Sequence, residues 1–496
     1  MREAVGEKAA RYGHSPTAFY TKQLLSTQTF RITMIYLAID FGGGSGRVIA
    51  GKLENGKLEM ELIHRFPNRQ VRLGNHVYWD FLALFEDMKT GLKMAGAKGL
   101  KVDGIAIDTW GVDFGLIDKD GNLLGNPVCY RDARTKGMPE EIFKQIDPSA
   151  HYAINGTQVM EINTLFQLHS LKKANSPQLE KAAHLLFTPD LFSYYLTGEA
   201  NNEYTIASTS ELLNATTKDW DWETIDQLGL PRHIFGKIVM PGTVRGKLRR
   251  DIAEETGLGE VDVIAVGSHD TASAVAAVPA TEDEYPMAFI SSGTWSLLGV
   301  EIEKPILTEE ARKAEFTNEG GIGGRITFLQ NITGLWIMQR LMAEWKENGE
   351  EQQFDIILPQ AEEAHINAII PVDDAAFQNP ASMQQAIIDY CATHQLQVPQ
   401  TKAEIVRCVL QSLAAKYAEA TAHLNEMLPQ PIKCMHIIGG GSQNKLLNRL
   451  TSEALGVPVI AGPIEATGMG NILTQALAKG EIKDIDELRA VVRQSI

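Results

Sequence analysis

The sequence has few cysteines, and their spacing does not suggest a disulfide framework. Only four occur in 496 residues, at positions 129, 391, 408 and 434, and no two form a C-x-x-C pair. So few thiols in so long a chain indicate reduced cysteines in a cytoplasmic protein rather than a secreted one held together by disulfides. The histidines and cysteines also lack the spacing that is typical of a zinc site along a sequence.

Long apolar runs and an excess of positive charge are missing as well. No apolar stretch approaches the roughly 18 residues that a membrane-spanning helix needs, and the first 33 residues lack a signal-peptide core. The 46 basic residues against 62 acidic ones give a net charge of −16, which argues against nucleic-acid or membrane partners. An anionic small molecule is still possible, because backbone N–H groups bind phosphate whatever the net charge of the chain.

Length and composition indicate a globular protein of several domains. A chain of 496 residues is too long for one ordinary core, and 44% hydrophobic with 22% charged residues excludes a disordered or repetitive chain. Regular patterning begins only at Met34, so we expect residues 1–33 to form a flexible N-terminal extension. The polar stretch at 281–286 breaks the pattern again. We therefore predict two domains, at residues 34–280 and 281–496.

The first patterned segment predicts a strand, a glycine-rich turn and a second strand. Residues 35–40 are apolar and end in Asp40, residues 42–47 read GGGSGR, and residues 48–50 resume an extended pattern. An Asn-Gly turn at 55–56 and alternating residues at 58–66 complete a hairpin. This order excludes Walker A loops and dinucleotide fingerprints, because both join a strand to a helix.

Similar patterns recur along the chain. Residues 104–108 and 112–117 predict a second strand pair, and residues 287–290 and 295–300 flank a polar turn that echoes the first half, which suggests an internal duplication. Residues 80–95 and 402–428 have helical spacing. The last pattern is a β-α-β unit, which predicts parallel strands. It consists of a strand at 432–438, a glycine-rich loop, a helix and a strand at 457–461.

Polar loops and acids gather where these strands end. The turns at 42–47, 291–294 and 439–444 each suggest backbone N–H groups directed at an anion, although a single turn of this kind is as well explained by a plain hairpin. Asp40, Asp108 and Asp270 follow apolar strands, where each alone could be a cap or a functional acid. Together, beside such loops, they favour Mg²⁺ handling and proton abstraction. Neighbouring residues 268–270 do not form a hydrolase triad, whose members come from separate segments.

Seven motifs together resemble the FGGY carbohydrate kinases, a family in the superfamily of sugar kinases, Hsp70 and actin. They are DFGGGSGR at 40–47, IDTWGVDF at 107–114, SHDTASAV at 268–275, SSGTWSL at 291–297, TNEGG at 317–321, NITGLW at 331–336 with QR at 339–340, and GGGSQN at 439–444. The likeness runs in order from about residue 34 to the C-terminus.

The resemblance implies a fold, an activity and a set of site residues. The fold is α/β, with two domains of the ribonuclease H-like kind around an ATP cleft, the first binding sugar and phosphate and the second binding nucleotide. The activity is phosphorylation of the ketose L-rhamnulose at O1 by ATP with Mg²⁺, in L-rhamnose catabolism. Asp270 corresponds to the general base. The family positions that contact the sugar are occupied here by Gly111, His269, Asp270, Thr271 and Asn331. Nucleotide contacts correspond to Gly43, Gly44, Ser45, Gly46, Arg47, Thr294, Gln339 and Gly440, and Asp40 corresponds to an acid that places Mg²⁺ through water.

Several alternatives stay open at this point. Within the family, L-fuculokinase or L-xylulokinase activity would leave similar phosphate loops. In a different class, a noncatalytic nucleotide switch of the Hsp70 or actin kind is possible, although the acid at Asp270 counts against it. A dehydrogenase is disfavoured because neither glycine-rich turn matches the dinucleotide fingerprint. The third glycine of the fingerprint falls on Arg47 in the turn at 42–47 and on Asn444 in the turn at 439–444. The sequence does not decide between a monomer and a homodimer.

Overall fold

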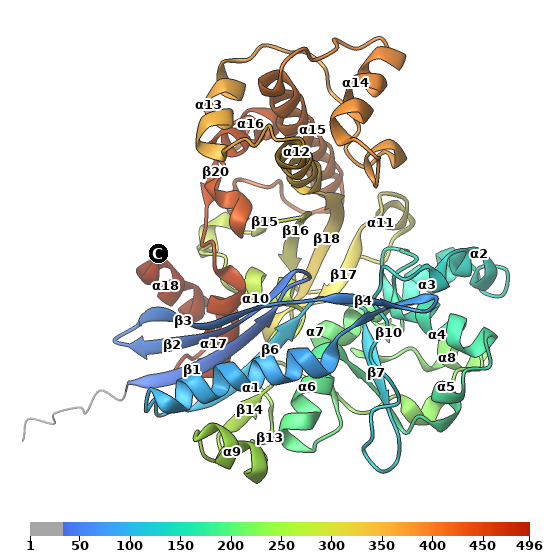
Figure 1. Ribbon diagram of the computed structural model, residues 1–496, viewed down its shortest axis with the longest axis vertical. Helices are drawn as coiled ribbons and strands as arrows, with labels where there is room; N and C mark the ends of the chain where they lie inside the picture. Colours follow the sequence, from blue (N-terminus) through green and yellow to red (C-terminus); the bar gives the residue numbers. More distant parts are fainter. Residues whose placement is uncertain (1–32) are drawn as a thin grey trace, which may run out of the picture. The chain divides into compact units, whose positions relative to one another are not determined.

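Two six-stranded sheets organise the part of the chain that the structure describes (Figure 1). The first has the order β13 (Val244–Lys247), β14 (Asp262–Ile264), β6 (Gly104–Thr109), β1 (Met34–Phe41), β2 (Ser45–Glu54) and β3 (Lys57–Pro67). The second has the order β17 (Thr317–Gly320), β18 (Ile326–Thr333), β16 (Trp295–Ile302), β15 (Ala288–Ser292), β19 (Met435–Ile438) and β20 (Val459–Ala461).

The structure is a computed structural model that describes residues 33–496, and these form one compact unit. The predicted extension at 1–33 therefore lies outside the described residues, apart from Thr33, and so does the segment in which a signal peptide would occur. Within the described part of the chain, no helix is long and apolar enough to cross a membrane.

Each sheet combines an antiparallel hairpin with parallel strands in the same arrangement. In the first, β1 pairs antiparallel with β2 and parallel with β6. In the second, β15 pairs antiparallel with β16 and parallel with β19, and β19 pairs parallel with β20. The strand–turn–strand predictions in both halves are confirmed. The turn between β2 and β3 places Asn55 at φ 59° and Gly56 at φ 74°, the left-handed backbone that a two-residue hairpin requires.

Helices cover both faces of the first sheet because the residues of β1 alternate between two cores. Leu37 and Ile39 enter a core shared with α1 (Phe81–Ala97) and α6 (Thr188–Thr197). Tyr36 and Ala38 enter a second core shared with α17 (Ala466–Ala478). Asp80 begins α1 as predicted, because its carboxylate accepts a hydrogen bond from Ala83 N at 3.3 Å.

The second sheet carries its own helical layer. Residues of α12 (Trp336–Glu347), α14 (Met383–Thr393) and α15 (Lys402–Met427) share a core with β15, β16 and β18. The predicted long helix is confirmed, and it begins with a capping box in which the Thr401 side chain accepts from Glu404 N and the Glu404 side chain accepts from Thr401 N. The other helices of this half are α11 (Glu309–Lys313), α13 (Phe354–Glu363), α16 (Lys445–Leu455) and α18 (Ile485–Ser495).

Two helices, α10 (Asp270–Ala276) and α17, lie between the sheets and join them. Their apolar residues share one core with Tyr36 of the first sheet and Phe289 of the second. The two helices approach so closely that a Cβ at Gly470 would overlap the backbone of Ser273. Helix α17, from the second half of the chain, thus packs against β1 and β6 of the first sheet. The predicted domain boundary at 280/281 stays a prediction.

One detail of the predicted strands differs from the structure. The strand that follows β6 does not pair with it: β7 (Phe114–Ile117) pairs antiparallel with β8 (His184–Phe187) in a separate ribbon. The cause lies between β6 and β7, where Val112 adopts φ 65° and turns the chain away from the sheet. Besides α6, the helices between residues 138 and 256 are short: α2 (Met138–Ile142), α3 (Pro148–Asn155), α4 (Thr164–Lys173), α5 (Pro177–Lys181), α7 (Tyr204–Ala207), α8 (Trp222–Gln227) and α9 (Arg250–Thr256).

Candidate active site

A cavity of about 390 Å³ lies where the carboxyl ends of parallel strands from both sheets meet. Such strand ends form the ligand crevice in open α/β sheets. The first sheet contributes the loop after β6 and the segment after β14, and the second contributes the β15–β16 turn and the loop after β19. Eight of the predicted site residues line the cavity: Arg47, Gly111, His269, Asp270, Thr271, Thr294, Asn331 and Gly440.

The other predicted residues do not line this cavity. Asp40, Gly43, Gly44, Ser45, Gly46 and Gln339 are absent from its wall. Gln339 still lies beside it, because Thr294 Oγ1 donates a hydrogen bond to Gln339 Oε1 at 3.1 Å. Asp40 lies behind Arg47, whose Nη2 atom is 2.6 Å from Asp40 Oδ2.

Asp270 is the first residue of α10 and faces the cavity with a side chain that is 31% exposed. Burial raises the pKa of Asp270 to about 6, the nearby charge of Asp40 adds to the rise, and His269 opposes it. Thr271 Oγ1 donates to Asp270 Oδ1 at 3.3 Å. A carboxylate of this kind is ionised at neutral pH and basic enough to take a proton.

His269 lies between two carboxylates. Its Nδ1 atom is 3.0 Å from Glu319 Oε2, and its Nε2 atom is 3.6 Å from Asp270 Oδ1. Burial alone would lower the pKa of His269, but the charges of Glu319, Asp270 and Glu203 raise it to about 9. The imidazole is therefore positively charged at neutral pH, in the wall of the cavity.

Backbone contacts hold residues 268–270 in place. Ser268 N donates to Glu203 Oε2 at 3.2 Å, and His269 N donates to Thr205 Oγ1 at 3.1 Å. Ser268 O accepts from Thr109 N of β6 at 2.9 Å. The direction in which Asp270 points is thus fixed by two neighbouring segments, 109 and 203–205. The sequence predictions did not include Glu203 or Glu319.

Three carboxylates from three adjacent strand ends lie near one another. Asp40 and Asp108 are direct partners in the parallel pairing of β1 with β6. Asp108 is fully buried, and burial together with the charges of Asp40 and Asp270 raises its pKa well above the usual range. Asn471 Nδ2 donates to Asp108 Oδ2 at 2.6 Å, while Asp108 Oδ1 has no hydrogen-bond partner among residues 33–496. A buried, unpartnered carboxylate oxygen between two further acids fits a divalent cation that prefers oxygen ligands.

The glycine-rich turns differ in why they need glycine. A Cβ at Gly46 would overlap the ring of Phe66, so this glycine serves packing. A Cβ at Gly43, Gly44 or Gly440 would meet nothing within 4 Å, and none of the three has positive φ. Glycine therefore does not serve a left-handed backbone at these three positions. What they leave is open space where backbone and a phosphate group can approach.

The sugar-side residues line the part of the cavity around β6 and β18. A Cβ at Gly111 would lie 3.1 Å from Thr209 Oγ1, so a larger side chain would have to displace Thr209. Asn331 Nδ2 donates to Gln158 Oε1 at 3.0 Å. The neighbouring Val112 is held in its left-handed conformation by a hydrogen bond from its N–H to Thr209 Oγ1 at 3.0 Å. Strain at such a position is typical of functional sites.

Rhamnulokinases of two bacteria match nearly the whole chain. A rhamnulokinase of Bacteroides thetaiotaomicron is 45% identical over 461 residues, which is 93% of this chain and 94% of that protein. A rhamnulokinase of Oceanobacillus iheyensis is 41% identical over 459 residues, which is 92% of this chain and 96% of that protein.

Solved structures of sugar kinases share the fold at low sequence identity. Gluconate kinase from Lactobacillus acidophilus superposes with a TM-score of 0.76 at 14% identity, over 93% of this chain and 92% of that one. Glycerol kinase from Plasmodium falciparum, solved with ADP, gives a TM-score of 0.76 at 15% identity, over 94% and 93%. The predicted α/β sugar-kinase fold with two domains is confirmed.

The two halves of the chain each match one domain of a single family. Residues 35–277 match the N-terminal domain of the FGGY family of carbohydrate kinases, and residues 288–479 match its C-terminal domain. Together with the 45% identity to a rhamnulokinase over 93% of this chain, these matches establish that the chain belongs to the FGGY family of carbohydrate kinases.

Proposed function

We propose that this sugar kinase phosphorylates L-rhamnulose at O1 with ATP, giving L-rhamnulose 1-phosphate and ADP in L-rhamnose catabolism, and that Asp270 is the general base. The observation that carries the proposal is the placement of Asp270. Its carboxylate lies in the wall of a cavity that polar loops of both sheets also line, with a pKa of about 6. The name of the relatives at 39–45% identity supports the choice of sugar.

In this proposal, Asp270 takes the proton of the O1 hydroxyl as that oxygen attacks the terminal phosphorus of ATP. A positioned base of this kind contributes roughly 10²–10⁴-fold to the rate. The imidazolium of His269, beside Asp270, donates a hydrogen bond to a sugar oxygen and stabilises the ionised carboxylate. Glu319 keeps His269 charged and oriented through the 3.0 Å ion pair.

The nucleotide would lie against the glycine-rich turns. The backbone at Gly43, Gly44 and Gly440 borders space that a side chain would fill, which suits close approach of phosphate oxygens. Arg47 and Thr294 add a cation and a hydroxyl, with Gln339 next to Thr294. Ser45 and Gly46 close the first turn, where Gly42 N donates to Ser45 O at 2.9 Å.

Asp40 and Asp108 are the residues that would hold a divalent cation, which we propose to be Mg²⁺. Bound there, Mg²⁺ would neutralise charge on the phosphates. Arg47 forms ion pairs with both Asp40 and Glu465. The family resemblance implies that Asp40 acts through water, and Asp108, its partner in the pairing of β1 with β6, adds a second carboxylate.

The sugar would occupy the part of the cavity lined by Gly111, Thr271 and Asn331. Tight packing of Gly111 against Thr209 and the fixed amide of Asn331 give this wall a defined shape. Buried polar groups of this kind discriminate between sugars that differ by one hydroxyl, because a missing partner leaves the protein group unpaired.

A panel of acceptors tests the proposed substrate. ADP release is measured with Mg·ATP and L-rhamnulose, L-fuculose, L-xylulose, D-xylulose or glycerol. The proposal predicts the highest kcat/KM for L-rhamnulose and negligible release without sugar. A higher value for L-fuculose or L-xylulose would assign the alternative kinase activities, and glycerol or D-xylulose as the best acceptor would refute the named substrate. Equal ADP release with and without every sugar would favour a noncatalytic nucleotide switch.

A further inference from the structure

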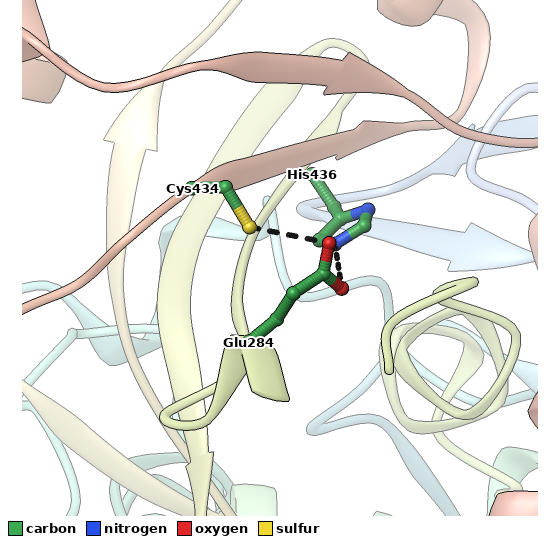
Figure 2. A group of neighbouring side chains, drawn as sticks. All are labelled: Glu284, Cys434 and His436. Atoms are coloured by element: carbon green, nitrogen blue, oxygen red, sulfur yellow. Dashed lines mark hydrogen bonds and ion pairs between the residues drawn. The ribbon is translucent and has the colours of Figure 1, made fainter. Parts of the chain in front are cut away.

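A second cluster of chemically active side chains lies outside the cavity. Glu284, Cys434 and His436 each offer one ligand atom, and these three atoms all lie within 4.8 Å of one another (Figure 2). The cluster sits at the amino end of β19, whereas Gly439 and Gly440, which line the kinase cavity, follow the carboxyl end of the same strand. The kinase reaction described above does not use any of the three residues.

The pairing of two strands explains why these residues meet. Cys434 and His436 are two positions apart on extended backbone, so their side chains project from the same face. Strand β15 pairs parallel with β19, with Ala288 opposite Met435. The short helical turn that precedes β15, which contains Glu284, therefore lies beside the residues that precede β19. Sequence spacing misses the cluster because Glu284 comes 152 residues before His436.

The distances fit a tetrahedral metal ion. His436 Nε2 is 3.9 Å from Cys434 Sγ and 3.1 Å from Glu284 Oε2. With Zn–S bonds of about 2.3 Å and Zn–N or Zn–O bonds of about 2.0–2.1 Å, neighbouring ligand atoms in a tetrahedron lie about 3.3–3.6 Å apart. Both observed separations differ from this range by only a few tenths of an ångström, which small side-chain rotations supply.

The chemistry of the three groups also suits such an ion. Thiolate and imidazole ligands select zinc-like transition metals and not Mg²⁺, which prefers oxygen. A thiolate and a carboxylate together neutralise a doubly charged ion, so the occupied site carries no net charge to bury. Cys434 and His436 are 7% and 1% exposed, while the Glu284 side chain is 22% exposed. Water can therefore reach a fourth coordination position beside Glu284.

We infer that Glu284, Cys434 and His436 form a binding site for one Zn²⁺-like transition-metal ion with water as the fourth ligand. The ion binds as the Cys434 thiol loses its proton to solvent, and no oxidation or reduction is involved. It ties the connecting segment 281–286 to the second sheet. Its position at the opposite end of β19 from the cavity makes it independent of the proposed kinase chemistry.

Cobalt substitution tests this inference directly. The full-length protein is freed of metal with a chelator, and Co²⁺ is added alone while the absorption spectrum is recorded. The inference predicts one bound Co²⁺ per chain, an intense visible spectrum of tetrahedral Co²⁺, and a thiolate charge-transfer band in the near ultraviolet. Added Zn²⁺ displaces Co²⁺ and abolishes the visible spectrum and the charge-transfer band. If wild-type protein shows no such band, the three side chains are only a hydrogen-bonded group and the inference is wrong.

Variants assign the band to this cluster. Cys434→Ser is expected to lose the charge-transfer band and to weaken Co²⁺ binding more than the roughly 10- to 100-fold that loss of an outer partner costs. Cys408→Ser is the matched control, because Cys408 is another buried thiol of the same half and its Sγ donates to Ala368 O at 3.5 Å. A band that persists in Cys434→Ser, or that disappears in Cys408→Ser, would overturn the assignment.

A second substitution covers the case in which Cys434→Ser does not fold. Glu284→Gln changes a partly exposed side chain of the connecting segment, keeps its shape and removes only its charge. It is expected to retain the charge-transfer band and to weaken Co²⁺ binding about tenfold or more. Unchanged Co²⁺ affinity in Glu284→Gln would contradict the site, whatever the behaviour of Cys434→Ser.

Discussion

Nδ1 of His269 lies 3.0 Å from Oε2 of Glu319, an ion pair that joins the segment after β14 in the first sheet to β17 in the second. His269 N also donates to Thr205 Oγ1, so both the backbone and the ring of this residue are fixed. The side chain next to it is the carboxylate of Asp270 in the cavity wall. The position and the charge of the proposed base therefore depend on a contact between the two sheets.

The pH dependence of the wild-type enzyme follows from these two groups. Asp270, with a pKa of about 6, must be ionised, so activity rises as the pH increases through about 6. His269, with a pKa of about 9, must stay protonated, so activity falls as the pH increases through about 9. We expect a bell-shaped plot of kcat/KM for the sugar, which reports the free enzyme. A rate that stays constant from about pH 5 to pH 10 would exclude both assignments.

Glu319→Gln should narrow this bell from both sides. Loss of the carboxylate lowers the pKa of His269, so the alkaline limb moves to lower pH. Less positive charge on His269 then stabilises ionised Asp270 less, so the acid limb moves to higher pH. A Glu319 with a purely structural role would lower kcat/KM equally at every pH. The shape of the profile, rather than its height, is the measurement that decides.

Asp108→Asn should stabilise the metal-free protein while weakening the response to Mg²⁺. The pKa of Asp108 is raised in the folded state, so its ionised form destabilises the fold, and stability is lost as the pH rises above the unfolded pKa. The gain in Tm from Asn should therefore be larger at about pH 8 than at about pH 5. Asn still accepts the hydrogen bond from Asn471.

The same Asp108→Asn protein tests the cation site by its Mg²⁺ requirement. We expect half-maximal activity at a Mg²⁺ concentration about tenfold or more above that of the wild type, because one charged oxygen ligand is lost. A higher Tm with an unchanged Mg²⁺ requirement would remove Asp108 from the proposed cation site.

Two alanine substitutions separate a phosphate-facing glycine from a packing glycine in one turn. Gly43→Ala places its methyl group in open space and should leave Tm unchanged while raising KM for ATP. Gly46→Ala places its methyl group on the ring of Phe66 and should destabilise the fold by about 1–3 kcal/mol. Thermal unfolding and ATP titration of both variants check this. Equal KM for ATP in Gly43→Ala and wild type would contradict nucleotide binding at this turn.

Local patterns predicted much of the fold. The Asn55-Gly56 turn, the cap at Asp80 and the long helix that begins after Thr401 are all encoded by neighbouring residues, and the structure confirms them. The predicted pairing of residues 112–117 with residues 104–108 is wrong, because a left-handed valine at position 112 gives no signal in sequence.

Contacts between distant residues limited what could be predicted of the site. Arg47 pairs with Glu465 across 418 residues, and Asp108 accepts from Asn471 across 363 residues. Glu319 lies in a recognisable motif, but its pairing with His269 depends on how two sheets face each other. The types of residue in the motifs indicated the chemistry, while the charges that tune Asp270 and His269 emerge only from the folded chain.

The central claim is tested most directly by kcat of Asp270→Asn with L-rhamnulose and Mg·ATP, measured beside ATP affinity. Asp262→Asn is a matched control. Asp262 begins β14, whereas Asp270 follows the other end of that strand, and Asp262 forms ion pairs with Lys247 and Lys479. With Asp270 as the base, kcat falls by roughly 10²–10⁴-fold in Asp270→Asn, while ATP affinity and the control stay near wild type. A kcat near that of the wild type in Asp270→Asn would contradict the account.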